Sequence, residues 1–139
     1  MNIKKVKVTE VGPRDGFQSE KTILNTEDKI DVINNLIDAG FPRIEVSSFV
    51  SPKAIPQLAD AATILENVKR NHETTLAALV PNARGALRAV DAKLDEIVVF
   101  LSASESHNKK NVKPHIKSFL SKILIRELNL KGINFNLIF

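Results

Sequence analysis

Five runs of apolar residues recur along the chain at intervals that leave room for a helix between each pair. They cover residues 6–11, 44–49, 75–80, 97–103 and 133–139. The runs are rich in valine, isoleucine, leucine and phenylalanine and hold few turn residues, which is typical of strands buried on both faces. The pattern therefore predicts five largely buried strands.

The segments between these runs carry apolar residues at helical spacing. The predicted helices cover residues 25–40, 57–70, 82–93 and 114–130. The first is the best marked, because Asn25 can cap its start and Gly40 can end it. In the third, Pro81 ends the preceding strand and Asn82 can cap the helix. The predicted order is βαβαβαβαβ.

Strict alternation of strands and helices indicates parallel strands joined by right-handed crossovers. Composition leaves both an open doubly wound sheet and a (β/α)8 barrel as candidates. In the second strand Arg43, Glu45 and Ser47 are predicted to share one face, and Ile44 and Val46 the other. A polar inner face favours a barrel. A complete barrel takes ~250 residues, so four and a half βα units make only about half of one. We therefore expect an α/β fold, the N-terminal half of a TIM barrel, as one partial domain over residues 1–139.

Composition and charge exclude several classes of protein. The net charge is +4 and the pI is near 9.4, but the lysines are spread along the chain and no tryptophan or tyrosine is present to stack on bases. We therefore expect no nucleic-acid partner. The absence of cysteine excludes disulfides and thiolate chemistry. Without the apolar core of a signal peptide or a run of about 18 apolar residues, a cytoplasmic protein with no membrane partner is expected.

The first strand is followed by a Gly12-Pro13 turn that presents Arg14 and Asp15 side by side. The loop after a parallel strand is where α/β folds carry their ligand chemistry. Asp15 is a hard oxygen ligand of the type that Mg²⁺ or Mn²⁺ takes, and Arg14 is a permanent cation able to stabilise an oxyanion. A local ion pair on a surface turn is the alternative interpretation.

Two carboxylates lie inside apolar runs, where an ionised group needs a partner to offset its loss of hydration. These are Glu10 and Glu45, and the available cations are Arg14 and Arg43. A buried structural ion pair and a catalytic carboxylate both remain open at this point. His107, just past the fourth run, is a candidate binding or gating residue, and no closely spaced histidine pair suggests a metal site.

Four stretches together resemble the 3-hydroxy-3-methylglutaryl-CoA lyases, in the wider family of metal-dependent barrel lyases and synthases that includes isopropylmalate and homocitrate synthases. They are EVGPRDGFQ at residues 10–18, IEVSSFVSPK at 44–53, LVPN at 79–82, and SASE at 102–105 running into KKN at 109–111. The first stretch alone indicates the wider family. The SFVSPK block indicates the lyase branch.

The resemblance implies cleavage of an acyl-CoA substrate, 3-hydroxy-3-methylglutaryl-CoA, to acetyl-CoA and acetoacetate with a divalent cation, Mg²⁺ or Mn²⁺. It implies that Asp15 is a metal ligand, that Arg14 stabilises the enolate-like oxygen of the leaving acetyl-CoA, and that Glu45 positions or deprotonates the substrate. The substrate or CoA site would be lined by Gln18, Ser48 and Asn111.

The resemblance further implies metal ligands in a His-x-His pair and a cysteine on a Gly-rich loop, and this sequence contains neither. Whether the chain catalyses by itself is therefore open. A related synthase condensing a 2-oxo acid and a noncatalytic remnant or assembly module of a split barrel are the alternatives. Unpaired strand edges predict a homodimer or a complex with a C-terminal half.

Overall fold

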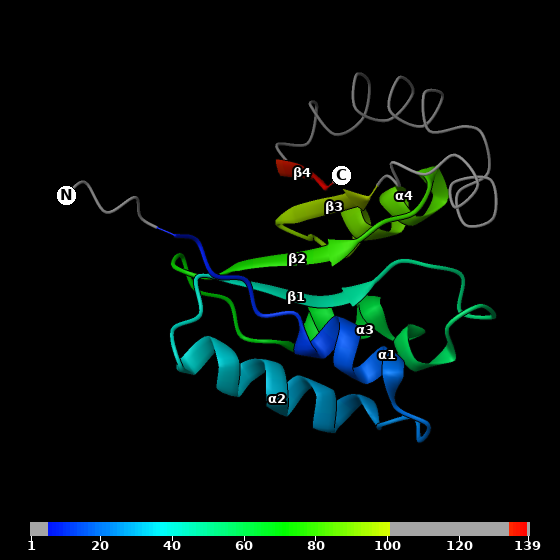
Figure 1. Cartoon of the computed structure of the whole chain (residues 1–139), viewed down its shortest axis with the longest axis horizontal. Coiled ribbons are helices and arrows are strands. Elements are labelled where there is room, and N and C mark those ends of the chain that lie inside the picture. The colour runs from blue at the N-terminus through cyan, green and yellow to red at the C-terminus, as the bar shows by residue number, and fades with distance from the viewer. Residues whose placement is uncertain (1–5, 101–133, 139) are drawn as a thin grey trace.

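The computed structural model describes residues 6–100 and 134–138. Within them the chain forms four strands and several helical segments (Figure 1). In chain order these are η1 (Gly12–Gly16), α1 (Phe17–Ser19), α2 (Thr26–Asp38), β1 (Arg43–Ser48), η2 (Pro56–Leu58), α3 (Ala61–Asn67), β2 (Thr75–Leu79), α4 (Ala83–Asp91), β3 (Glu96–Phe100) and β4 (Asn134–Ile138).

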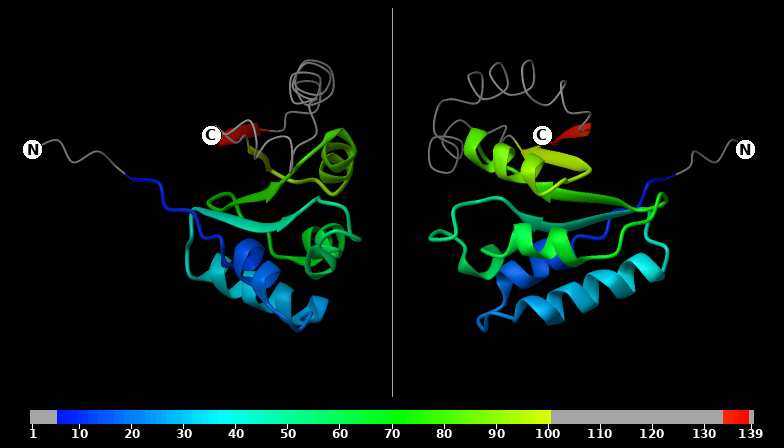
Figure 2. Two further views of the ribbon diagram at one scale, coloured as in Figure 1. Left: turned by 45° about the vertical axis from the view of Figure 1, so that its right-hand side comes forward. Right: turned by 180° about the vertical axis from the view of Figure 1, so that it is seen from behind.

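The four strands form one sheet in the order β1-β2-β3-β4, and every neighbouring pair is parallel. Seen from behind, α3 and α4 lie in front of the sheet, and α2 continues the helical layer below them (Figure 2). The core lies between these layers, where Ile33 of α2, Ile64 of α3 and Ala89 of α4 pack against outward residues of the strands. Sequential parallel strands with helices outside confirm the predicted α/β half-barrel arrangement.

The helix boundaries follow the predicted caps where the sequence provides one. The Asn25 side chain accepts a hydrogen bond from Asp28 N at 2.8 Å, and Gly40, with a φ of 80°, follows the end of α2. Asn82 caps α4 in the same way through Gly85 N at 2.9 Å. The predicted helix over 57–70 is divided into η2 and a shorter α3 that ends at Asn67. The predicted helix over 114–130 lies outside the described residues.

The predicted first strand over residues 6–11 is wrong as a regular element. Its single bridge joins Glu10 to Ile44, and among the described residues no backbone hydrogen bond involves residues 6–9. Val6 and Val8 are 85% and 55% exposed. A strand needs neighbours along its length to satisfy its backbone and cover its side chains, and here β1 meets the segment only near Glu10.

A β-bulge in β1 corrects the predicted face of Ser47. The register shifts between Glu45 and Ser47, so that Ser47 pairs with Ala78 and Ser48 with Leu79. Ala78 belongs to the core beneath the helices, whereas Ala77, the partner of Glu45, does not. Because one extra residue reverses the alternation of side chains, Ser48 rather than Ser47 joins Glu45 on the inner face.

A buried lysine ties α2 to the segment that follows β1. Lys29 is 1% exposed, and its Nζ donates to the Gln57 carbonyl at 2.7 Å and to both Asp60 carboxylate oxygens at 3.0 and 2.9 Å. The buried charge is thus paired and hydrogen-bonded, as burial requires. No helix in the described part of the chain is long and apolar enough to cross a membrane.

Gly85 allows α4 to approach β1, and its replacement tests this packing. A Cβ at position 85 would lie 2.6 Å from the Phe49 carbonyl oxygen, whereas one at Gly16 would meet nothing within 4 Å. We expect Gly85→Ala to lower the free energy of unfolding by about 1–3 kcal/mol, because backbone atoms must move apart. Gly16→Ala, at a helical φ of −62°, should leave stability unchanged or raise it slightly. Urea unfolding followed by circular dichroism measures both, and equal stability of the two variants would contradict the close approach.

Candidate functional site

Arg14 and Asp15 lie in a helical turn rather than in the simple Gly-Pro turn that the sequence suggested. In η1 the amides of Arg14 and Asp15 both donate to the Val11 carbonyl, at 3.0 and 2.8 Å. Glu10, just before it, is bridged in parallel to Ile44 at the start of β1. Because the two segments run in the same direction, the residues after Glu10 advance towards the carboxyl end of β1, where parallel barrels place their chemistry.

Five side chains of alternating charge form a continuous network on the inner side of the sheet, which we call the charge network. At its outer end Arg14 Nη1 lies 2.8 Å from Asp15 Oδ1, and Arg14 Nε lies 3.1 Å from Glu45 Oε2. The other Glu45 oxygen lies 3.5 Å from Arg43 Nη1, and Arg43 Nη2 lies 2.6 Å from Glu96 Oε1. The network thus connects η1 to β1 and β3.

Burial increases from Asp15 to the middle of the charge network, and Glu96 at its far end is 11% exposed. The side chain of Asp15 is 64% exposed and that of Arg14 is 21% exposed, while those of Glu45 and Arg43 are 4% and 5% exposed. Barrel interiors are usually filled by branched apolar side chains, and buried ions are costly unless they are paired. Several paired charges on this face therefore point to a site rather than to a folding device.

Ala77 makes room for the buried part of the charge network. In the strand register Glu45 pairs with Ala77, and Ala77 pairs with Glu96, so a single small residue separates the two carboxylates. Ala77 is completely buried. Arg43 spans this gap, since its guanidinium reaches Glu45 on its own strand and Glu96 on β3.

The expected ion partners of the strand carboxylates are confirmed for Glu45 and wrong for Glu10. Glu45 contacts both Arg14 and Arg43. Glu10 instead accepts a hydrogen bond from Gly12 N at 2.6 Å. Its carboxylate therefore stabilises the start of η1, where an acceptor near the first amides is favourable.

The predicted substrate-binding residues differ in burial and in whether the structure describes them. Ser48 is 1% exposed on the inner face, and its hydroxyl donates to the Leu79 carbonyl at 3.1 Å. Gln18 lies exposed in the short helix α1. Asn111 and His107 lie outside the described residues. Ser48 and Gln18 thus remain predicted substrate-binding residues.

Sequence reasoning missed Glu96 and Thr9, which complete the surroundings of Arg43. Glu96 receives hydrogen bonds from Arg43 Nε and Nη2 at 2.9 and 2.6 Å, and Thr9 Oγ1 accepts one from Arg43 Nη1 at 3.1 Å. A signal for Glu96 was present. Arg43 and Glu96 each precede an apolar run directly, and opposite charges at the amino ends of parallel strands come to the same edge of the sheet.

The described residues do not form a complete cation site. Among them no group of three or more histidine, cysteine, aspartate or glutamate side chains could hold a metal ion. Both Glu45 oxygens contact guanidinium groups, so Asp15 is the exposed carboxylate of the charge network. A Mg²⁺ or Mn²⁺ ion needs several oxygen ligands, of which this part of the chain offers one.

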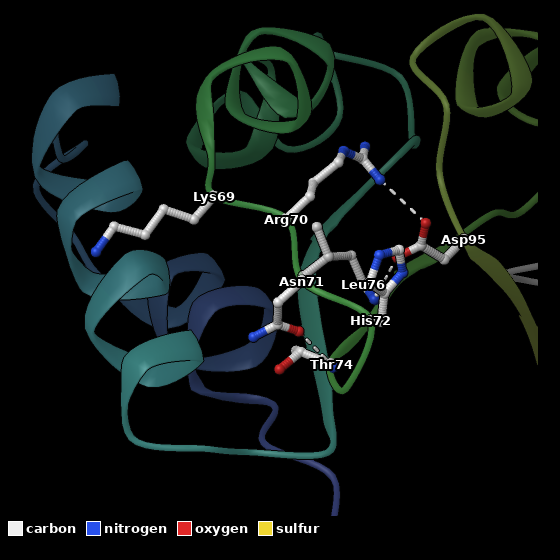
Figure 3. Close-up of a pocket in the computed structure, with 7 residues that line it drawn as sticks. All are labelled: Lys69, Arg70, Asn71, His72, Thr74, Leu76 and Asp95. Atoms are coloured by element: carbon white, nitrogen blue, oxygen red, sulfur yellow. Dashed lines mark hydrogen bonds and ion pairs between the residues drawn. The ribbon is translucent and has the colours of Figure 1, made fainter.

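A separate cavity of about 520 Å³ opens at the opposite, amino end of the strands (Figure 3). Arg70 Nη1 lies 3.0 Å from Asp95 Oδ1 on its wall, and Lys69 pairs with Asp38. The two cations are therefore engaged within the protein. The cavity is lined by Lys69, Arg70, Asn71, His72, Thr74, Leu76 and Asp95. Because parallel barrels react at the carboxyl ends of their strands, this cavity is not the candidate site.

Fold and site together define a partial parallel α/β barrel with a charged inner face that reaches solvent at Asp15. A family model described as HMGL-like matches residues 5–125. The chain belongs to this family of hydroxymethylglutaryl-CoA lyase-like proteins.

The relatives and solved structures agree with this assignment. The chain is 50% identical over 109 residues to a hydroxymethylglutaryl-CoA lyase of Bacillus subtilis, a match that covers 78% of this chain and 36% of the relative. A solved lyase from the same species has a TM-score of 0.89 at 40% identity, covering 97% of this chain and 46% of that one. A lyase from Acinetobacter baumannii, solved with coenzyme A and 3-methylmalate, has a TM-score of 0.87 at 43% identity, covering 93% and 43%. The chain thus spans less than half the length of these relatives.

Proposed function

We propose that this chain is the N-terminal half of a barrel that cleaves 3-hydroxy-3-methylglutaryl-CoA to acetyl-CoA and acetoacetate. The observation that carries the proposal is the charge network, in which Arg14 joins a buried glutamate to an exposed aspartate at the carboxyl end of β1. Barrel lyases of the family resemble the chain over this region. We propose the cytoplasmic location predicted from the sequence; the relatives named by compartment include cytoplasmic lyases of Danio rerio and Mus musculus and mitochondrial lyases of Bos taurus and Rattus norvegicus.

The cleavage needs a proton acceptor at the C3 hydroxyl and positive charge at the thioester oxygen. As the hydroxyl proton leaves, the C2–C3 bond breaks and its electron pair moves to the thioester carbonyl as an enolate, which protonation turns into acetyl-CoA. In our proposal Glu45 positions or deprotonates the substrate, and Arg14 stabilises the enolate oxygen. The two guanidinium groups beside Glu45 hold its carboxylate in one orientation.

Substrate and cation contacts complete the proposal. The acyl-CoA substrate is supported by the Acinetobacter baumannii neighbour solved with coenzyme A. We assign its binding to Gln18, Ser48 and Asn111. Metal dependence is a property of this enzyme family, and Asp15 is the residue that we assign to a divalent cation, Mg²⁺ or Mn²⁺. Such a cation, when bound, polarises the substrate oxygens as a Lewis acid.

Acetoacetate release tests the proposed function. The chain is assayed with 3-hydroxy-3-methylglutaryl-CoA and Mg²⁺ or Mn²⁺, alone and mixed with the part of the Bacillus subtilis lyase that it does not match. We expect cleavage at least by the mixture, because the described residues supply one cation ligand. Asp15→Asn should reduce the rate by about 10² or more, the scale of losing an electrostatic group at the reacting centre.

The matched control for that assay is Asp38→Asn. Asp38, the last residue of α2, is also an exposed acid in an ion pair, but its partner is Lys69, which follows α3. Its replacement should leave the rate unchanged. Absence of cleavage in both preparations, or an Asp15→Asn mixture as active as the unmodified one, would refute the proposal.

A further inference from the structure

The helical segment that carries Arg14 and Asp15 runs from η1 into α1 without interruption. The amide of Phe17, the first residue of α1, donates to the Arg14 carbonyl, and the Ser19 hydroxyl donates to the Asp15 carbonyl at 2.9 Å. Residues 12–19 therefore form one short helical unit. Because both charged side chains lie inside this unit, a displacement of either of its ends changes their position.

The two ends of the helical unit are held by different contacts. Before its start, Glu10 N donates to the Arg43 carbonyl at 3.0 Å, and Glu45 N donates to the Glu10 carbonyl at 2.8 Å. At its other end, the Glu20 carbonyl accepts a hydrogen bond from Gln57 Nε2 of η2 at 3.2 Å. No other hydrogen bond in the described part of the chain joins residues 17–20 to an element outside the unit.

The position of Gln57 depends in turn on the buried lysine of α2. Lys29 Nζ donates to the Gln57 carbonyl at 2.7 Å and to both oxygens of Asp60, and Thr26 Oγ1 donates to Asp60 Oδ2 at 2.9 Å. A buried ammonium restricts the movement of its acceptors, because a donor that loses its acceptor away from water costs free energy. Lys29 therefore fixes η2, and through Gln57 it fixes the end of the helical unit.

We propose that Lys29 is a positioning residue for the proposed lyase site, on which it acts without touching the reacting atoms. Its contacts reach the helical unit through Gln57, and the unit presents Arg14 to Glu45, with the Arg14 Nε to Glu45 Oε2 distance at 3.1 Å. Its consequence for catalysis rests on the proposed function, whereas its placement of η1 does not.

Stability alone is a poor reason for a charged pair at this place. Replacing a buried ion pair by apolar residues of similar volume is often neutral or stabilising. Lys29 is 1% exposed, and Ile33, one turn further along α2, is a core residue. An apolar side chain could fill the same space. It could not hold the Gln57 carbonyl and the Asp60 carboxylate in one arrangement, which is the feature that a positioning residue supplies.

Hydrogen exchange on the chain alone, without substrate or metal, tests the placement of the helical unit. The variants are Lys29→Met/Asp60→Asn, which removes both buried charges, and Gln57→Ala, which leaves them in place. In both we expect the Arg14 and Asp15 amides to exchange about threefold faster or more relative to the β2 amides, the scale of losing one hydrogen bond. The β2 amides report global unfolding, so this exchange ratio removes any general loss of stability.

The acetoacetate assay tests the consequence for catalysis, with the mixture of this chain and the unmatched part of the Bacillus subtilis lyase. Both variants should lower kcat about tenfold or more and change KM less, because a small misplacement of a group at the reacting centre costs up to ~10²-fold. The matched control is Lys69→Met/Asp38→Asn, which removes an exposed ion pair between α2 and the residues after α3. It should leave kcat and the exchange ratio unchanged.

Two results would overturn the positioning role of Lys29. One is an unchanged exchange ratio in either variant. The other is undiminished kcat in a mixture whose Lys29→Met/Asp60→Asn chain shows the raised ratio, since the pair would then serve stability alone. If the unmodified mixture does not cleave the substrate, the proposed function fails, and the exchange ratio of the chain alone still decides whether Lys29 places η1.

Discussion

Replacing Arg43 with methionine is expected to lower the free energy of unfolding by about 3–5 kcal/mol, the scale of breaking a buried ion pair by removing one partner. Arg43 is 4% exposed and contacts both Glu45 and Glu96. Without it Glu96 loses its close cation, and Glu45 keeps only Arg14. Chemical unfolding followed by circular dichroism measures the change.

The control for Arg43→Met is the same substitution at Arg70. Arg70 pairs with Asp95, but the two side chains are 37% and 40% exposed, so its loss should cost no more than about 1 kcal/mol. Adding Glu96→Gln to Arg43→Met should recover part of the lost stability, because the uncompensated carboxylate is then gone. If Arg43→Met and Arg70→Met lower the free energy of unfolding equally, burial does not determine how much an ion pair contributes to stability here.

Replacing Arg14 with methionine is expected to lower kcat for the proposed cleavage by about 10²–10³, as loss of an oxyanion-stabilising group does. This prediction rests on the proposed function. It uses the same acetoacetate assay, with the mixture of this chain and the unmatched part of the Bacillus subtilis lyase, at saturating substrate. Arg14 also orients Glu45 through a 3.1 Å contact, so both proposed catalytic groups are affected. Arg14→Lys should recover part of the rate, since it restores the charge without the planar fork of donors.

Arg70→Met is again the matched control, because Arg70 lies at the opposite end of the strands. It should leave kcat unchanged. A melting curve for each variant shows whether the protein is folded at the assay temperature. A folded Arg14→Met variant with undiminished kcat would exclude the role that we assign to this guanidinium.

The sequence predicted most of the fold because its signals are local. Asn25 and Asn82 cap the helices that they were expected to cap, and Gly40 follows α2 with the positive φ that glycine adopts readily. The apolar runs located β1 to β4, and their alternation with helices predicted the parallel order. The first run failed, since apolar composition alone does not provide the neighbours that a strand requires.

The candidate site was predicted only in part, because some of its contacts join residues that are far apart in sequence. Arg14 and Asp15 are adjacent in sequence, so their ion pair could be expected directly. The contact of Arg43 with Glu96 joins residues 53 positions apart, and only the strand register brings them together. The bulge in β1, which moves Ser48 rather than Ser47 to the inner face, leaves no composition signal.

The sequence by itself determined the family, the parallel α/β fold and the charged residues that follow the first apolar run, because short motifs, caps and apolar spacing are properties of neighbouring residues. Only the tertiary structure decided which charges meet. It paired Glu45 with two arginines, assigned Glu10 to a backbone amide, joined Glu96 to Arg43, and paired the buried Lys29 with Asp60. These features depend on strand register and burial, which arise from contacts between distant segments and leave no local pattern in the sequence.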